Sequence, residues 1–312
     1  MPFVWQFPYE PPDAAALDRM RQNFPMPSEI MPYAWFMTGV DLMTWLAESA
    51  SENFSAKQLT NAIHEIWTGI AFFPNAYPEV WGEWLRYLLP YAIKVMNSID
   101  DDSWNPLLFP TTFKAIYKVF PEQIADEYSG FRDDLVYTFG TRIFPQVLSR
   151  DNPATRAPES ASLQNPVFND IWDYTNSPGM ENPGNYDVFY FAMYFCLVYL
   201  NAAEIESWVE SMLKIESPQW RLSILTRWLA LVRGEDDDND FKVSPPPANM
   251  AAFYEAMKRH LSHERFRTWV ADIKSHQTFK TQDHYIFPIS DALRTSIEQS
   301  LVDFETKFFS VE

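Results

Sequence analysis

The chain has 312 residues, of which 47% are hydrophobic and 17% aromatic, so it holds enough apolar area for the core of one large domain or of two medium ones. With 42 acidic and 24 basic residues its formal net charge is −18, and this negative charge opposes binding to the phosphate backbone of a nucleic acid. The composition therefore argues against a disordered chain and against a nucleic-acid partner.

Cysteine content and apolar runs predict the cellular compartment. Cys196 is the only cysteine, so no intramolecular disulfide can form, and its apolar neighbours in residues 191–200 indicate a core thiol. The first residues contain several prolines and no basic stretch, which does not fit a signal peptide. The longest apolar run, residues 188–200, is shorter than the roughly 20 residues that span a bilayer. We therefore expect a cytoplasmic protein without membrane association.

The N-terminal half is predicted to consist of an arm and a helical domain. Residues 1–33 combine prolines with aromatic residues, which predicts an extended arm packed on the body. Residues 34–150 form the predicted helical domain. Within it, residues 55–58 have the spacing of a capping box, and we expect Pro78 and Pro121 in the first turns of helices.

The C-terminal half alternates between helices and breaks. Asn, Ser and Pro are frequent in a long irregular loop at 151–186, which is followed by central helices at 187–233. An acidic, Pro-rich linker at 234–248 then leads to C-terminal helices at 249–312. The last of these helices is the clearest, because apolar residues recur in it at helical spacing, namely Leu293, Ile297, Leu301, Phe304 and Phe308.

Helical periodicity without sustained alternation predicts an all-α fold. Consecutive helices joined by short turns with proline resemble, in style, the HEAT-like class of α-solenoids, which implies stacked helical hairpins in an irregular α-solenoid. No fixed sequence period is present. A compact irregular helical domain explains the same pattern, so the two architectures stay open as alternatives.

The sequence motifs of common enzyme classes are absent. The chain contains no G-x-S-x-G, no G-x-G-x-x-G, no Walker A sequence and no H-E-x-x-H. His260 and His263 are spaced so that they can share a helix face, which leaves a metal site there as a further alternative. We expect no bound cofactor.

Two acidic runs offer one route to catalysis. Residues 236–240 match a D-D-x-x-D spacing, and Asp100 and Asp101 end an apolar helical segment. Both features resemble the motifs with which isoprenoid synthases, including terpene cyclases, hold magnesium and diphosphate in an aromatic-lined helical cavity. The resemblance implies Asp100 and Asp101 as metal ligands. The chain departs from the motif because no carboxylate follows these two at the needed position and Pro106 stops the helix. Solvated loops at helix ends are the simpler reading of both runs.

The candidate binding residues are basic and aromatic. Residues 251–282 carry more basic than acidic side chains, and Arg259, Arg265 and Arg267 are among them. These arginines either dock on acidic groups of the protein itself or bind an anionic ligand or an acidic partner segment. Three tryptophans lie near prolines in irregular stretches, where exposed rings can form a recognition surface, namely Trp5, Trp35 and Trp104.

The function that follows is a non-catalytic helical interaction protein, immunity- or adaptor-like, whose acidic surface binds a basic protein partner. The alternative is a magnesium-dependent enzyme or a small-ligand binder with an aromatic-lined helical cavity.

Overall fold

The protein is all-α, as the sequence predicts. The computed structural model describes residues 2–5, 13–30, 46, 54–72, 75, 78–96, 108–143, 188–214, 221, 224–225, 249–275 and 291–309. Within these ranges it contains ten α-helices, one π-helix and no strand. The chain divides into two compact units. We call Trp5–Val147 the N-terminal unit, and Leu148–Glu312 together with Met1–Val4 the C-terminal unit.

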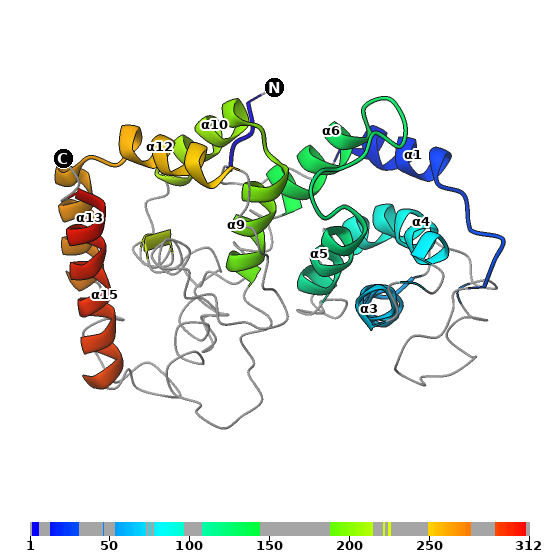
Figure 1. The fold of residues 1–312 in the computed structure, drawn as a ribbon, viewed down its shortest axis with the longest axis horizontal. Coiled ribbons are helices and arrows are strands. Elements are labelled where there is room, and N and C mark those ends of the chain that lie inside the picture. The colour runs from blue at the N-terminus through cyan, green and yellow to red at the C-terminus, as the bar shows by residue number, and fades with distance from the viewer. Residues whose placement is uncertain are drawn as a thin grey trace, which may run out of the picture. The chain divides into compact units, whose positions relative to one another are not determined.

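The N-terminal unit is organised around helix α4. Its elements are α1 (Ala14–Asn23), α3 (Ala56–Phe72), α4 (Pro78–Met96), α5 (Leu108–Val119), α6 (Phe131–Leu135) and the π-helix η3 (Val136–Ile143). Helix α4 contacts α1, α3, α5 and η3, and α3 also packs against α5 (Figure 1). The core side of α4 consists of large apolar side chains that are at most 2% exposed, namely Trp81, Trp84, Leu85 and Leu88. Burial of these rings and aliphatic chains supplies the apolar area that holds the unit together.

Two helices begin where the local sequence signals predict. The Ser55 N–H donates to Gln58 Oε1 at 3.0 Å and the Gln58 N–H donates to Ser55 Oγ at 3.3 Å, so a capping box precedes α3. Pro78 is the first residue of α4, where its missing N–H leaves no helical hydrogen bond unmade. The prediction for Pro121 is wrong, because α5 ends at Val119 and this proline follows the helix that it cannot continue.

The predicted extended arm contains a helix. Helix α1 lies in a stretch without proline, and the Asp13 carboxylate caps its first turn. Residues 2–5 and 24–30 form neither helix nor strand, and Phe3 and Trp5 are buried. Proline prevents helix formation only around the positions that it occupies, so the remaining stretch of the arm is helical.

The C-terminal unit contains two helix pairs. Its elements are α9 (Val188–Tyr199), α10 (Ala202–Met212), α12 (Met250–His260), α13 (His263–Ser275) and α15 (Asp291–Phe309). Helix α10 packs against α12, and α13 lies alongside α15 (Figure 1). Leu301, Phe304 and Phe308 of α15 are buried, as their spacing predicts. Cys196 is fully buried and burial raises the pKa of its thiol, which confirms a core cysteine.

Two predicted segments, the loop at 151–186 and the linker at 234–248, lie outside the described residues. Among the helices that the structure describes, none is both long enough and apolar enough to cross a membrane.

Two glycines inside helices mark close contacts in the N-terminal unit. A Cβ at Gly69 of α3 would lie 2.5 Å from two ring carbons of the Trp81 indole, so the missing side chain lets the indole lie against α3. A Cβ at Gly82 of α4 would meet Nη1 of Arg86 at 2.7 Å, and this neighbour is the end of a flexible side chain. A methyl group at Gly69 would therefore clash with a rigid ring, whereas a methyl group at Gly82 would meet a group that can move.

We expect Gly69→Ala to destabilise the protein by about 1–3 kcal/mol, because the buried Trp81 indole has no space to retreat. Gly82→Ala is the matched control. Its effect should be small, because the Arg86 guanidinium can shift and alanine favours the helix by about 1 kcal/mol over glycine. Thermal unfolding followed by circular dichroism measures both, and equal melting temperatures for the two variants would contradict the close contact at Gly69.

Candidate functional site

Four predicted site residues, Trp35, Trp104, Asp100 and Asp101, lie outside the described residues, so their roles stay predictions. Trp5 is described, and the expectation that it is exposed is wrong, because it is 3% exposed. Burying an indole ring removes a large apolar area from water, and a neighbouring proline does not prevent this. Trp5 therefore belongs to the core and does not form an exposed recognition surface.

Arg259 pairs with an acidic residue of its own unit. Its guanidinium donates to both carboxylate oxygens of Glu206, which lies on α10. Glu206 Oε1 also lies 2.5 Å from Nε2 of His260. The hydrogen bond from Arg259, and after it the one with His260, lowers the pKa of the Glu206 carboxyl group. This carboxylate joins α10 to the last turn of α12.

Arg267 pairs with a carboxylate of α15. Its Nε donates to Glu305 Oε1 at 3.0 Å, and His263 Nε2 lies 2.5 Å from the same oxygen. His260 and His263 therefore contact different carboxylates. Among the described residues, no group of three or more His, Cys, Asp or Glu side chains is placed to hold a metal ion. The two histidines serve helix contacts in the described part of the chain.

Arg265 binds backbone oxygens and an aromatic ring. Its Nη2 donates to the carbonyl oxygen of Leu213 at 2.6 Å, and its Nη1 donates to that of His260 at 3.3 Å. Its guanidinium and that of Arg221 lie over the Trp269 ring, 5.9 and 5.3 Å from the ring centroid. Arg259, Arg265 and Arg267 are thus all engaged by groups of the C-terminal unit.

A similar network joins α1 to α6 in the N-terminal unit. Arg19 donates to both carboxylate oxygens of Asp134, at 2.8 and 2.5 Å, and the Tyr128 hydroxyl donates to the same carboxylate at 2.7 Å. The hydrogen bond to Asp134 raises the pKa of the Arg19 guanidinium, and burial raises the pKa of the Tyr128 hydroxyl. A bidentate pair of this kind fixes the orientation of one helix relative to the other.

Every arginine whose side chain the structure describes is engaged within its own unit. Arg265 binds carbonyl oxygens, and the others form ion pairs, namely Arg19–Asp134, Arg21–Asp18, Arg86–Glu127, Arg132–Asp133, Arg221–Asp272, Arg259–Glu206 and Arg267–Glu305. Several exposed carboxylates of the same described residues have no ion-pair partner, among them those of Glu79, Glu83, Glu122, Asp126, Glu255 and Glu264. Negative charge is therefore left over at the surface.

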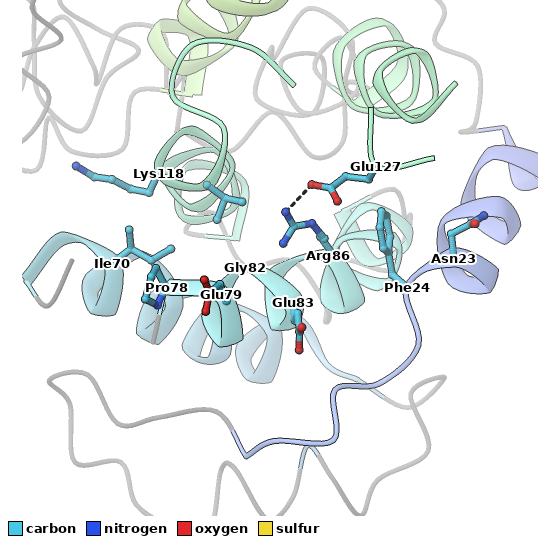
Figure 2. A pocket seen from close by; sticks show the side chains of 11 residues that line it. Asn23, Phe24, Ile70, Pro78, Glu79, Gly82, Glu83, Arg86, Lys118 and Glu127 are labelled. Carbon is cyan, nitrogen blue, oxygen red and sulfur yellow. Dashed lines mark hydrogen bonds and ion pairs between the residues drawn. The ribbon is translucent and has the colours of Figure 1, made fainter. Parts of the chain in front are cut away.

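A surface pocket of about 570 Å³ lies beside α4 in the N-terminal unit (Figure 2), and we call it the α4 pocket. It collects residues from the end of α1, from α3, α4 and α5, and from the loop that precedes α6. Its apolar lining consists of Phe24, Ile70, Pro78, Gly82 and Val119. Its polar lining consists of Asn23, Glu79, Glu83, Arg86, Lys118 and Glu127. The charged and amide groups of this lining can bind and orient a ligand.

Arg86 lies at the centre of the α4 pocket. Its Nη2 donates to Glu127 Oε1 at 2.5 Å, as Figure 2 shows, and its guanidinium lies 5.4 Å from the centroid of the Phe120 ring. Its Nε is buried without a hydrogen-bond partner, and its Nη1 occupies the space that a Cβ at Gly82 would fill. The hydrogen bond to Glu127 is therefore the one that this guanidinium makes among the described residues, and its Nη groups carry further N–H donors.

Glu79 and Glu83 place negative charge on the same face of α4, one helical turn apart. Both are exposed, and within the described part of the chain neither carboxylate has an ion-pair partner. Figure 2 shows the Glu83 carboxylate directed away from the Arg86–Glu127 pair. Glu79 lies in the first helical turn, where the helix dipole favours an acidic residue, and Glu83 lies beyond that turn. Glu79 and Glu83 repel each other at this spacing. Arg86, three residues after Glu83, is the nearest basic residue on this face of α4, although its ion pair is with Glu127.

Sequence reasoning missed the α4 pocket, although two signals for it are present in the sequence. One is Gly82, a helix-weakening residue inside an apolar helical pattern. The other is the pair of acidic residues Glu79 and Glu83, one helical turn apart on the same face.

Comparison of the chain with protein-family models gives no match, and comparisons with curated proteins and with solved structures give no significant match. The functional conclusion therefore rests on the residues of this chain.

The double variant Glu206→Gln/Glu305→Gln should melt below the wild type at neutral pH and approach it as the pH falls below the usual carboxyl pKa of 4.5. Arg259 and His263 hold the pKa of these carboxyl groups below its usual value of 4.5. A lowered folded-state pKa gives stability that is complete above the unfolded-state pKa and is lost as the pH falls through the folded-state values. Calorimetric melting at a series of pH values measures this, with Glu122→Gln, an exposed carboxylate outside these pairs, as control. A melting difference independent of pH would contradict the pairs.

Proposed function

We propose that the protein is a non-catalytic helical interaction protein, immunity- or adaptor-like, whose acidic surface binds a basic protein partner. The observation that supports this most strongly is the distribution of charged groups. Every described arginine is engaged by its own unit, whereas exposed carboxylates such as those of Glu79, Glu83 and Glu122 are not. A surface of this kind attracts cations and repels anions.

The excess of acid is spread over both units. The N-terminal unit has 18 acidic and 9 basic residues, and the C-terminal unit has 24 and 15, so each has a formal net charge of −9. Arginine is the side chain best suited to bind phosphate and nucleic acids, and the described arginines are already in use. A basic protein is therefore a better partner for either unit than a nucleic acid.

The packing of consecutive helices supports a broad protein-binding surface. Helices α3, α4 and α5 follow one another in the chain and pack against one another. Such packing supports stacked helical hairpins as the architecture of this part of the N-terminal unit, with a compact irregular domain as the alternative.

A tagged full-length protein should capture a stoichiometric basic partner from extracts of its native host at low salt and release it at high salt, because salt screens exposed charges. Mass spectrometry of the bound fractions identifies that partner. Titration of the purified partner into the protein at increasing salt then measures whether affinity falls with ionic strength.

Two results would contradict the proposal. One is the absence of a partner at either salt concentration. The other is a rise of several degrees in the melting temperature on addition of magnesium or pyrophosphate, because a specific ligand stabilises the folded state that binds it. The second result would favour the magnesium-dependent enzyme, for which Asp100 and Asp101 are the candidate ligands.

A further inference from the structure

We propose that the α4 pocket is the docking site for a basic side chain, arginine or lysine, on a peptide segment of the protein partner. This inference rests on the proposed function and assigns it to a defined place on the N-terminal unit. Four features of the described residues carry it: departures from helix rules, charge, apolar lining and unused hydrogen-bond donors.

Three features that are unfavourable by local rules meet on one side of α4. Gly82 is a glycine in the middle of a helix, Glu79 and Glu83 repel each other at one-turn spacing, and the Nε of Arg86 is buried without an acceptor. The opposite side of the same helix is a regular apolar core. Sequences depart from local stability rules mainly at functional sites, so the clustering of three departures indicates a binding surface.

The unpaired charge in the α4 pocket is complementary to a cation. Glu127 is neutralised by Arg86, and Figure 2 shows the Lys118 side chain extending away from Glu83. Glu79 and Glu83 are therefore left without a positive partner within the described residues. A cation supplied by another molecule would interact with both carboxylates and remove their mutual repulsion.

The apolar lining suits the aliphatic part of a long basic side chain. Phe24, Ile70 and Val119 come from three different elements and line the same pocket. Lysine and arginine bury their methylene groups against such surfaces while the charged head reaches polar groups. A volume of about 570 Å³ holds one such side chain together with part of its backbone.

Arg86 provides the polar contact for the peptide backbone. Its guanidinium donates to Glu127 and keeps further N–H groups for another acceptor. Carbonyl oxygens of an extended peptide are acceptors of the required kind, and they are present whatever the neighbouring side chains. A peptide segment thus satisfies the guanidinium and the two carboxylates at the same time.

Three acetylated and amidated tripeptides test the proposal, each with leucine at both ends and arginine, citrulline or glutamate in the middle. Citrulline keeps the shape of arginine and lacks its charge. Amide NMR spectra of the isotope-labelled full chain give both the site and the affinity. We expect the arginine peptide to shift amide signals of residues 79–88 and to bind about three to five times more tightly than the citrulline peptide.

A matched pair of variants assigns the effect to the pocket. Glu79→Gln/Glu83→Gln should abolish the preference for arginine over citrulline. Glu122→Gln/Asp126→Gln changes the charge by the same amount at exposed carboxylates outside the pocket lining, and it should keep the preference. Circular dichroism melting checks that both variants fold. If the first variant is destabilised, the single change Glu83→Gln, beyond the first turn of α4, replaces it.

Any of four results would overturn the inference. These are equal binding of the arginine and citrulline peptides, tighter binding of the glutamate peptide, signal changes confined to other elements, and equal loss of preference in both variants. The affinity of the pocket variant for the partner from the capture experiment distinguishes failure of this inference from failure of the proposed function. If Glu79→Gln/Glu83→Gln still binds that partner with wild-type affinity, the protein is an acidic interaction protein and the α4 pocket is not its docking site.

Discussion

The shortage of positive charge constrains both how the helices of this protein are joined and what its surface presents. The chain has 24 basic residues against 42 acidic ones, and several of the described arginines, among them Arg19, Arg259 and Arg267, lie at contacts between elements. Arg19 joins α1 to α6, and Glu206 and Glu305 join helix pairs of the C-terminal unit through Arg259 and Arg267. Bidentate and partly buried pairs hold two elements in a fixed geometry better than exposed pairs do. Because the described arginines are engaged in this way and acidic residues outnumber basic ones, the surface carries a surplus of carboxylates, which favours a cationic partner.

On helix α4, part of this surplus negative charge lies at a defined pocket. One side of the helix is held in the core by Trp81 and Trp84, and the close approach of Trp81 to Gly69 fixes α4 against α3. The pocket side presents Glu83 and the guanidinium of Arg86. A helix that is anchored on its apolar side positions the groups on its other side without further ordering on binding, which lowers the entropic cost of docking.

Much of the helical framework is predictable from sequence, because its signals are local. The capping box before α3, the proline at the start of α4 and the apolar spacing of α15 act within a few residues, and the structure confirms each. Proline content does not predict the burial of Trp5, because the large apolar area of the indole ring favours its burial. It does not predict helix α1 either, because this helix forms in a stretch without proline and is capped by Asp13. The site was not predictable in this way. Arg259 and Glu206 are 53 residues apart, and the lining of the α4 pocket comes from separate elements, so only the tertiary fold brings these groups together.

Zero-length crosslinking of the complex between the full chain and its captured partner tests the central claim most directly. A carbodiimide joins a carboxylate to a lysine amine only when the two groups are in contact, and mass spectrometry then identifies both residues. The account predicts crosslinks from Glu79 or Glu83 to a lysine of the partner, and their loss at high salt. Crosslinks that involve only carboxylates of the C-terminal unit would contradict it.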